Sequence, residues 1–461
     1  MKIYLILVIA TFLVAALAER RFDSSILTTL QKTNSVNIIV SFKGSNTTRI
    51  VNELKTLKTS RASKAKSAYN VLKNHADTIQ ANLLGKLSKF KSILPIEVTQ
   101  LWITNQVIIK YANRSLFEEL LTLEEVSRIT EEQHFKLSRN ISRSGLVPNA
   151  EAQWGVVSIQ APEVWKSGFK GAGVVIASID SGVRGTHEAL KDGFRQQHGW
   201  YDPVYKTTEP IDTLGHGTHT MGTVLGRKYG IGVAPEAQWI ACRACPDETC
   251  STLDLIQCGQ WIACPTDSYG NNPRCDLGPD VVSNSWGFGR TQFFHNVIQL
   301  WVAIGIIPIV STGNFGNVCG SILSPADHND AIAVGSVDNT NQVSMFSGRG
   351  PVSATGLMKP EIAAPGLEIY SAVHDSDYSY DYMDGTSMAA PHVSGLVALL
   401  LSRKPDLIQS QMELLLLLGA QRIAPVNETC VVRDDVYPNN HVGSGKVNAK
   451  ISFDSINLLF P

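Results

Sequence analysis

The chain has 461 residues, enough for more than one domain but too few for several large ones. Its formal net charge is −1, 18% of its residues are charged and 44% are hydrophobic. This balance argues against a nucleic-acid-binding protein, an acidic tail or a protein held on a membrane surface by charge. We therefore expect a globular protein whose partners are neither nucleic acid nor membrane.

Residues 1–18 have the pattern of a secretory signal peptide. Met1 and Lys2 precede an apolar run that ends with Ala16-Leu17-Ala18. The small residues at the end of this run favour cleavage before Glu19 over the alternative, an uncleaved signal anchor. No later run reaches the roughly 18 apolar residues that a membrane span needs, and residues 414–418 predict a buried helix instead.

Residues 19–140, with an approximate end point, predict a small α+β domain in which strands and helices alternate. The expected strands lie at 36–42, 106–110 and 126–131, and the expected helices are a long, lysine-rich one at 49–90 and a short one at 115–125. Residues 135–148 predict an accessible linker, because small and turn-forming residues gather there. These residues are Ser142, Ser144, Gly145 and Pro148.

Residues 141–461 predict a second domain. An apolar run at 174–179 is typical of a strand buried on both faces, and Asp180 follows at its carboxyl end. Asp180 could instead close a turn through an Asx hydrogen bond. Gly215-His216-Gly217-Thr218-His219 predicts a loop that enters a helix. A metal site at the two histidines is the alternative, but no third ligand stands nearby.

Eight cysteines occur, six of them within residues 242–275, together with Cys319 and Cys430. An even number behind a signal peptide predicts disulfide bonds, of which eight cysteines allow 105 connectivities. The alternative is a zinc site begun by Cys242-Arg243-Ala244-Cys245, which the irregular spacing of the other cysteines disfavours.

Further strands are expected at 279–287, 306–310 and 331–337, with a buried helix at 295–305. This alternation predicts an α/β domain with a doubly wound, largely parallel sheet and helices on both faces. The strand at 306–310 leads to Asn314, which could be a turn residue. Trp286 is a candidate wall of a binding subsite or an ordinary packing residue.

The stretch Asp384-Gly385-Thr386-Ser387 precedes an apolar run that predicts a buried helix. A hydroxyl at a helix N-terminus lies beside free backbone N–H groups and the positive end of the helix dipole, where negative charge is stabilised. Ser387 therefore suits a nucleophile, although Thr386 or Ser387 could simply cap the helix.

Three motifs together resemble those of subtilisin-like serine endopeptidases, the subtilase family. They are Asp180-Ser181-Gly182, Gly215-His216-Gly217-Thr218-His219 and Gly385-Thr386-Ser387-Met388-Ala389-Ala390-Pro391-His392. Ser311-Thr312-Gly313-Asn314 resembles the oxyanion-hole element of the family. Asn284-Ser285-Trp286-Gly287 is similar to the substrate-binding strand of its bacillopeptidase F-like members.

The resemblance implies a role for each residue. Ser387 would attack the scissile carbonyl, His216 would accept and return the proton, and Asp180 would orient His216. Asn314 would bind the oxyanion together with the backbone N–H of Ser387. Ser285, Trp286 and Gly287 would bind substrate. Because His216 has to be neutral to act as a base, a neutral-to-alkaline activity optimum is expected.

The resemblance further implies that residues 19–140 form an inhibitory pro-segment whose tail occupies the cleft until it is cut. We expect a secreted or secretory-compartment monomer that acts on protein or peptide substrates and requires no cofactor. Calcium is common in the family, but no loop here has a recognisable acidic ligand spacing. Sequons predict surface glycans in a secreted eukaryotic protein. They begin at Asn46, Asn113, Asn140 and Asn427.

Two other readings remain open at this point. One is a secreted pseudoprotease that binds peptides without cutting them, although no residue of the expected Asp-His-Ser set is missing. The other is an inhibitor in which the N-terminal domain is the functional part.

Overall fold

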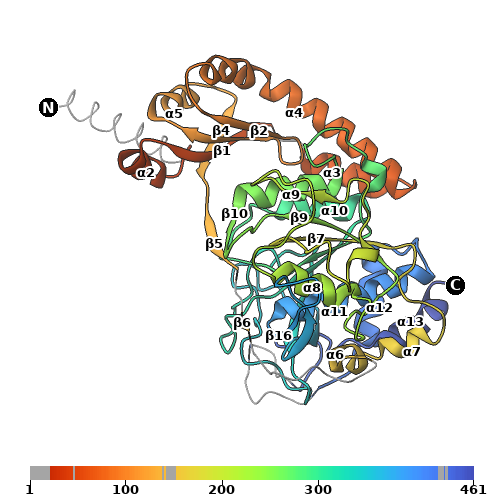
Figure 1. Ribbon diagram of the computed structural model, residues 1–461. Coiled ribbons are helices and arrows are strands. Elements are labelled where there is room, and N and C mark those ends of the chain that lie inside the picture. The colour runs from red at the N-terminus through yellow and green to blue at the C-terminus, as the bar shows by residue number, and fades with distance from the viewer. Residues whose placement is uncertain (1–20, 45–46, 138–139, 142–151, 424–429, 431–434) are drawn as a thin grey trace.

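The computed structural model describes residues 21–44, 47–137, 140–141, 152–423, 430 and 435–461. Several predicted features lie outside these residues. They are the signal segment at 1–18, the sequon residues Asn46 and Asn427, and the linker residues Ser142, Ser144, Gly145 and Pro148. The described chain forms a small N-terminal domain that sits on a larger C-terminal domain (Figure 1). Among the described residues, no helix is both long enough and apolar enough to cross a bilayer.

The N-terminal domain is built on a four-stranded antiparallel sheet with the order β2-β3-β1-β4. Its strands are β1 (Val36–Phe42), β2 (Glu97–Leu101), β3 (Gln106–Ala112) and β4 (Val126–Glu131). Its helices are α2 (Ser25–Thr33), α3 (Thr47–Thr56), α4 (Arg61–Lys91) and α5 (Arg114–Leu121). The predicted α+β domain and its three predicted strands are confirmed, whereas β2 and α2 were not predicted.

The prediction of a single helix over residues 49–90 was wrong, because the chain breaks between α3 and α4. Ser60 has an extended backbone and its hydroxyl accepts a hydrogen bond from the backbone N–H of Ser63 at 3.3 Å. This side-chain cap satisfies a free N–H group at the start of α4 and defines a new helix start.

The C-terminal domain contains a seven-stranded parallel sheet with the order β14-β13-β12-β11-β7-β9-β8. Its strands are β7 (Val175–Asp180), β8 (Trp200–Tyr201), β9 (Gln238–Arg243), β11 (Val281–Asn284), β12 (Ile307–Ser311), β13 (Ile332–Val337) and β14 (Ile362–Pro365). The predicted parallel, doubly wound sheet is confirmed.

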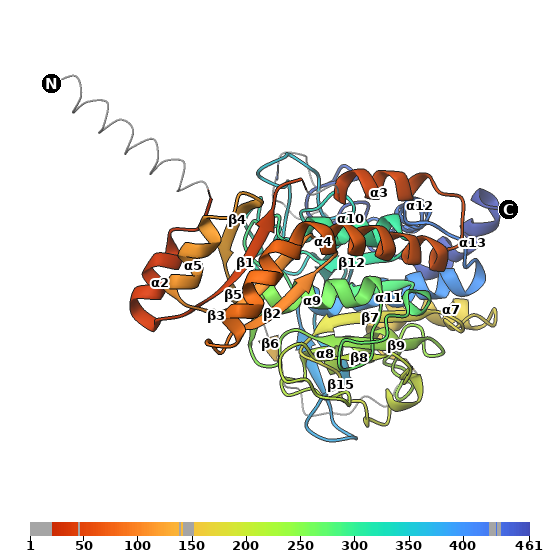
Figure 2. The same ribbon diagram turned by 90° about the horizontal axis from the view of Figure 1, so that it is seen from above.

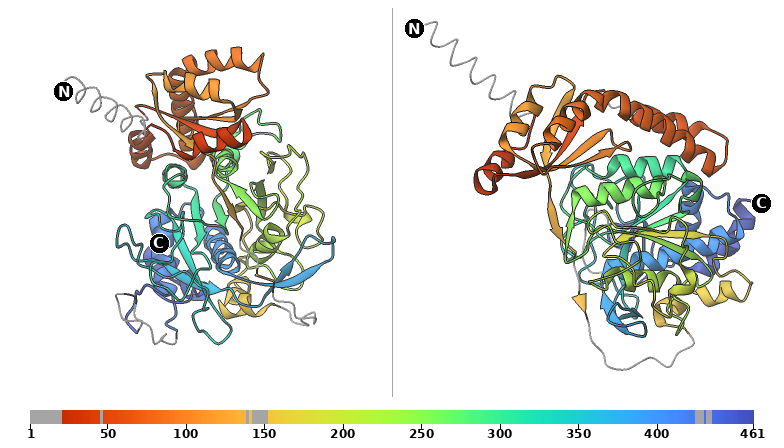
Figure 3. Two further views of the ribbon diagram at one scale, coloured as in Figure 1. Left: turned by 90° about the vertical axis from the view of Figure 1, so that its left-hand side faces the viewer. Right: turned by 45° about the horizontal axis from the view of Figure 1, so that its top comes forward.

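Helices cover both faces of this sheet, as its strands, buried on both sides, require (Figures 2 and 3). One face carries α9 (Thr252–Ala263) and α10 (His295–Ala303), and the N-terminal domain lies over these two helices. The other face carries α8 (His216–Leu225) and α11 (Thr386–Arg403). The remaining helices are α6 (Trp154–Ser158), α7 (Ala161–Trp165), α12 (Gln409–Gly419) and α13 (Ala449–Leu459), with short 3-10 turns η1 (Lys191–Gly193) and η2 (Cys275–Leu277).

All eight cysteines form disulfide bonds, as predicted. The pairs are Cys242–Cys258, Cys245–Cys250, Cys264–Cys275 and Cys319–Cys430. Because Cys242 and Cys245 are both bridged, the alternative of a zinc site at these residues was wrong. Three bridges tie α9 and its flanking segments together, and the fourth connects segments that are distant in the sequence.

Replacing Cys319 and Cys430 by serine should lower the free energy of unfolding by about 2–5 kcal/mol, because this bridge closes a long loop. Its sequence separation is 111 residues, against five for Cys245–Cys250, so the same change in the short-range pair should cost less. Denaturant unfolding of the two double variants, each carrying Ser387→Ala, measures the difference. Equal losses would contradict the loop-closure account.

Candidate active site

The predicted site residues come from three elements that end or begin at the carboxyl edge of the parallel sheet. Asp180 is the last residue of β7, His216 is the first of α8 and Ser387 is the second of α11. Gly215 has φ 88°, a left-handed conformation that lets the chain turn into α8. A Cβ added at Gly217 would lie 2.0 Å from the carbonyl oxygen of Gly182, so only glycine allows the two loops to approach this closely.

Asp180 and His216 form a buried pair. His216 Nδ1 lies 2.8 Å from Asp180 Oδ1, and each side chain is 1% exposed. The same carboxylate oxygen accepts the backbone N–H of Ser181 at 2.7 Å. A carboxylate facing Nδ1 keeps the ring proton on that nitrogen and leaves Nε2 as the basic atom. His216 Nε2 is buried and has no hydrogen-bond partner among the described residues.

A second carboxylate, that of Asp212, holds the loop in front of His216 and was missed from the sequence. Its oxygens accept the backbone N–H groups of Leu214 at 3.0 Å and Gly215 at 2.8 Å. Ser181 Oγ also donates to Asp212, at 2.9 Å, and accepts the N–H of Gly217 at 2.9 Å. These bonds join the Asp180 turn to the His216 turn. The sequence signal was an acidic residue four positions before His216.

Ser387 is 6% exposed, and its hydroxyl donates to the backbone carbonyl of Ser285 at 2.9 Å. Ser285 Oγ in turn donates to the carbonyl of Ser387 at 2.8 Å, so the end of β11 is fixed to the start of α11. Of the expected Asp-His-Ser set, Asp180 and His216 are therefore hydrogen-bonded to each other, whereas the Ser387 hydroxyl donates to Ser285 instead.

Asn314 follows β12 and lies beside the start of α11. Its Oδ1 accepts both the backbone N–H of Thr386 at 3.0 Å and the Thr386 hydroxyl at 2.9 Å. Thr386 Oγ1 also accepts the N–H of Gly313 at 3.2 Å. These bonds fix the carbonyl end of the amide, so Nδ2 is left to donate on the other side. Thr386 is a second residue that sequence reasoning missed, because this contact joins segments 72 residues apart.

The other two histidines of the motifs are structural. His219 Nε2 lies 2.9 Å from the carbonyl oxygen of Ile369, and burial lowers the pKa of His219 to about 3. His392 Nδ1 lies 2.8 Å from the carbonyl oxygen of Met388, and burial lowers the pKa of His392 to about 4. Both rings therefore stay neutral at pH 7. No group of three potential metal ligands occurs in the part of the chain that the structure describes.

The chain that leaves the N-terminal domain runs across this site. Strand β5 (His134–Lys136) pairs with β10 (Thr249–Ser251), and Leu137 N–H donates to the carbonyl of Glu248 at 2.7 Å. Strand β6 (Asn140–Ile141) then pairs with β16 (Tyr380–Asp384), which runs into α11 and Ser387 (Figure 1). None of these short pairings was predicted.

An aromatic side chain anchors β5 against the C-terminal domain. The ring of Phe135 stacks on that of Phe288, with centroids 4.0 Å apart, and lies 6.3 Å from the ring of Trp286. Trp286 is 2% exposed and packs edge-to-face on Phe294, at 5.1 Å. Trp286 is therefore a packing residue whose ring also contacts Phe135 of β5, and its role in a substrate subsite stays a prediction.

The fold and these side chains define a parallel α/β protein with a buried Asp–His pair and, at the same edge of the sheet, a hydroxyl at a helix N-terminus. Residues 171–445 match the subtilase family. The chain is 32% identical to Bacillopeptidase F of Bacillus subtilis over 96% of its own length, 33% identical to Subtilisin DY of Bacillus licheniformis over 56%, and 35% identical to Thermitase of Thermoactinomyces vulgaris over 54%. It covers 32%, 88% and 82% of these relatives, respectively, so it spans about a third of Bacillopeptidase F. The chain belongs to the subtilase family.

Proposed function

We propose that this chain is a secreted serine endopeptidase made as an inactive precursor. The observation that carries the proposal is the path of the chain itself: β5 pairs with β10, and β6 pairs with β16, which leads into Ser387, as an extended protein substrate could. Backbone pairing of this kind suits many peptide sequences, because it depends little on side chains.

In the proposed mechanism, the Ser387 hydroxyl exchanges the Ser285 carbonyl for His216 Nε2, which accepts its proton as the oxygen attacks the scissile carbonyl. Asp180 accepts the Nδ1–H bond and stabilises the imidazolium that forms. The Asn314 amide and the Ser387 N–H bind the oxyanion. His216 then gives the proton to the leaving amine, and water enters to hydrolyse the acyl-enzyme by the same route.

The N-terminal domain, residues 19–140, acts in this proposal as the pro-segment that blocks the cleft. Its tail fills the place of substrate while the connecting chain is intact. The first cut then falls between Leu137 and Asn140, because Leu137 bonds to Glu248 and Asn140 pairs with Asp384, which lies three residues before Ser387. This position lies within the 135–148 linker that the sequence predicts, and residues 138–139 lie outside the described residues.

The N-terminus of the active enzyme tests this assignment directly. We expect mass spectrometry of the mature chain to find a first residue at position 138, 139 or 140, and a fluorophosphonate probe to label the peptide that contains Ser387. A first residue beyond 141 would move the cut away from the cleft. Mature protein that binds casein but takes up no probe would support the pseudoprotease reading instead.

Replacing Phe135 by alanine should slow self-cutting by roughly tenfold or more. The change removes the apolar burial and the ring stacking that seat β5 in the cleft. Lys136→Ala, one residue on and exposed, is the matched control and should cut at the wild-type rate. The rate is measured from the loss of full-length chain with time, and equal slowing of both variants would contradict a specific role for the ring.

A further inference from the structure

Strand β10, which pairs with β5, belongs to a small loop that a disulfide bond closes. Cys245 and Cys250 are five residues apart in the sequence, and both are fully buried. Cys250 is the middle residue of β10 and lies opposite Phe135 in the register of the two strands. One end of this bridge is therefore in the strand that receives the extended chain.

The other end of the bridge is held on the backbone of Asp180. The N–H groups of Ala244 and Cys245 both donate to the carbonyl oxygen of Asp180, at 3.0 and 3.1 Å. These two residues directly follow β9, whose last residue, Arg243, is the sheet partner of Asp180. The disulfide bond thus links a backbone partner of Asp180 to β10.

The residues between the two cysteines also contact the segment that leads to His216. The hydroxyl of Thr213, three residues before His216, donates to the carbonyl of Pro246. The carbonyl of Glu248 accepts the N–H of Leu137 at 2.7 Å. The loop therefore lies between the turn that carries His216 and the extended chain that pairs with β10.

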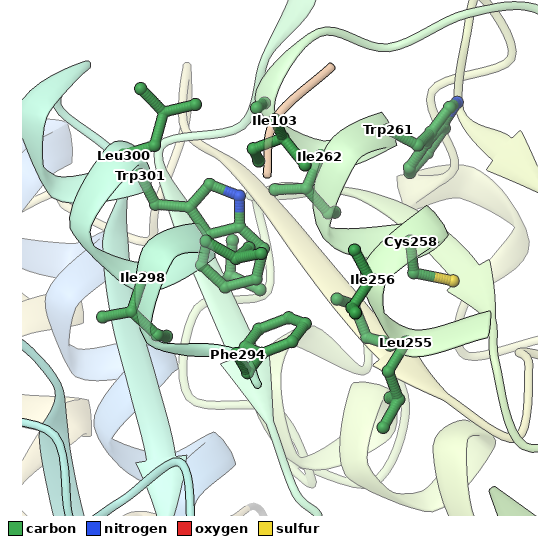
Figure 4. Packing of buried hydrophobic residues seen from close by; sticks show 14 of the residues in the cluster. Ile103, Leu255, Ile256, Cys258, Trp261, Ile262, Phe294, Ile298, Leu300 and Trp301 are labelled. Carbon is green, nitrogen blue, oxygen red and sulfur yellow. The ribbon is translucent and has the colours of Figure 1, made fainter. Parts of the chain in front are cut away.

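Strand β10 depends on these connections. Among the described strands it pairs with β5 alone, so no strand of its own domain supports it. Its last residue, Ser251, precedes α9, and the Ser251 hydroxyl accepts the N–H of Leu253 at 3.1 Å. Apolar side chains of α9 and α10 lie in one buried cluster together with Cys258 of α9 (Figure 4). Helix α9 thus holds the carboxyl end of β10, and the bridge joins its centre to the Asp180 turn.

We propose that the Cys245–Cys250 bridge is a positioning element for extended substrates. This inference rests on the proposed endopeptidase function. The bridge keeps β10 in place relative to Asp180, so that a peptide paired with β10 brings its scissile bond to the reacting groups. Without the bridge, each binding event has to order the loop again, which costs conformational entropy and loosens the alignment. A substrate too short to reach β10 makes no use of the bridge.

The test compares two substrates of the mature enzyme, with active molecules counted by a fluorophosphonate probe. One is a peptide that copies residues 134–141, and the other is an ester of a single acetylated amino acid. In Cys245→Ser/Cys250→Ser, kcat/KM for the peptide should fall about ten- to a hundredfold further than kcat/KM for the ester. The matched control is Cys264→Ser/Cys275→Ser, which opens the bridge beyond the other end of α9. It should keep the wild-type ratio of the two values.

A wild-type ratio in Cys245→Ser/Cys250→Ser would overturn the proposal. If this variant did not mature, uncut chains carrying Ser387→Ala would decide. Opening the Cys245–Cys250 bridge should speed amide hydrogen exchange in residues 134–137 by about three- to tenfold relative to the matched control. Equal exchange would overturn the proposal as well. Wild-type protein that hydrolyses neither substrate would refute the endopeptidase function, and the exchange measurement would still test the bridge.

Discussion

Ser387→Ala should lower kcat/KM for peptide substrates by about 10⁶-fold, the magnitude found when the nucleophile is removed from an enzyme of this kind. The hydroxyl is the only part of the residue that the change removes. Its present partner is the carbonyl of Ser285, and the bond from Ser285 Oγ to the carbonyl of residue 387 remains in the variant. The fold should therefore survive, and the purified chain should stay at full length because it cannot cut between Leu137 and Asn140.

The matched control is Ser394→Ala on the same helix. Ser394 is buried and its hydroxyl donates to the carbonyl of Ala390 at 3.1 Å, a bond within α11. Like Ser387→Ala, this variant removes a single buried hydroxyl from α11, but it should cut itself and hydrolyse peptides normally. Residual self-cutting of Ser387→Ala at more than a trace, in protein free of other proteases, would assign the nucleophile to another residue.

Asn314→Asp should lower kcat by at least 100- to 1,000-fold, the magnitude typical of a lost oxyanion donor, with a smaller effect on KM. The substitution is chosen because the structure separates the two ends of the amide. Oδ1 accepts two bonds from Thr386, and an aspartate retains that acceptor. The other end changes from an N–H donor to a negative charge that faces the developing oxyanion.

The control for this prediction is Asn317→Asp, an exposed residue three positions further along the same loop. It introduces the same charge without touching Thr386 and should leave kcat nearly unchanged. Thermal unfolding of both variants checks that the loop is intact. A loss confined to KM, with kcat preserved, would mean that Asn314 binds the ground state of the substrate and not the oxyanion.

The candidate site residues could be predicted from the sequence because their positions in the fold are set by nearby residues. An apolar run makes β7 a buried strand, so Asp180 at its end lies at the sheet edge. A glycine before His216 and another before Ser387 permit the turns that begin α8 and α11. These sequence patterns lie within a few positions of the residues whose location they predict. The strands of the parallel sheet were predictable for the same reason, since each has its own local apolar run.

Short-range signals failed where an element owes its structure to a distant partner. Strand β5 has three residues and β6 has two, too few for any periodicity to appear, and each exists because it pairs with β10 or β16. The break at Ser60 was missed because helical periodicity continues on both sides of it. The four disulfide pairs could not be chosen among 105 connectivities, since only folding brings the sulfur atoms together.

By itself, the sequence determined which residues we expect to carry the chemistry: an acid after a buried strand, an imidazole and a hydroxyl at helix starts, and an amide after another strand. Tertiary structure decided how these groups are engaged. It joined Asp180 to His216, bonded the Ser387 hydroxyl to Ser285, oriented the Asn314 amide by its bonds to Thr386, and paired the chain's own strand β5 with β10. The physical reason is that these bonds join groups far apart in the chain, whose meeting depends on the packing of the whole domain and not on local backbone preference.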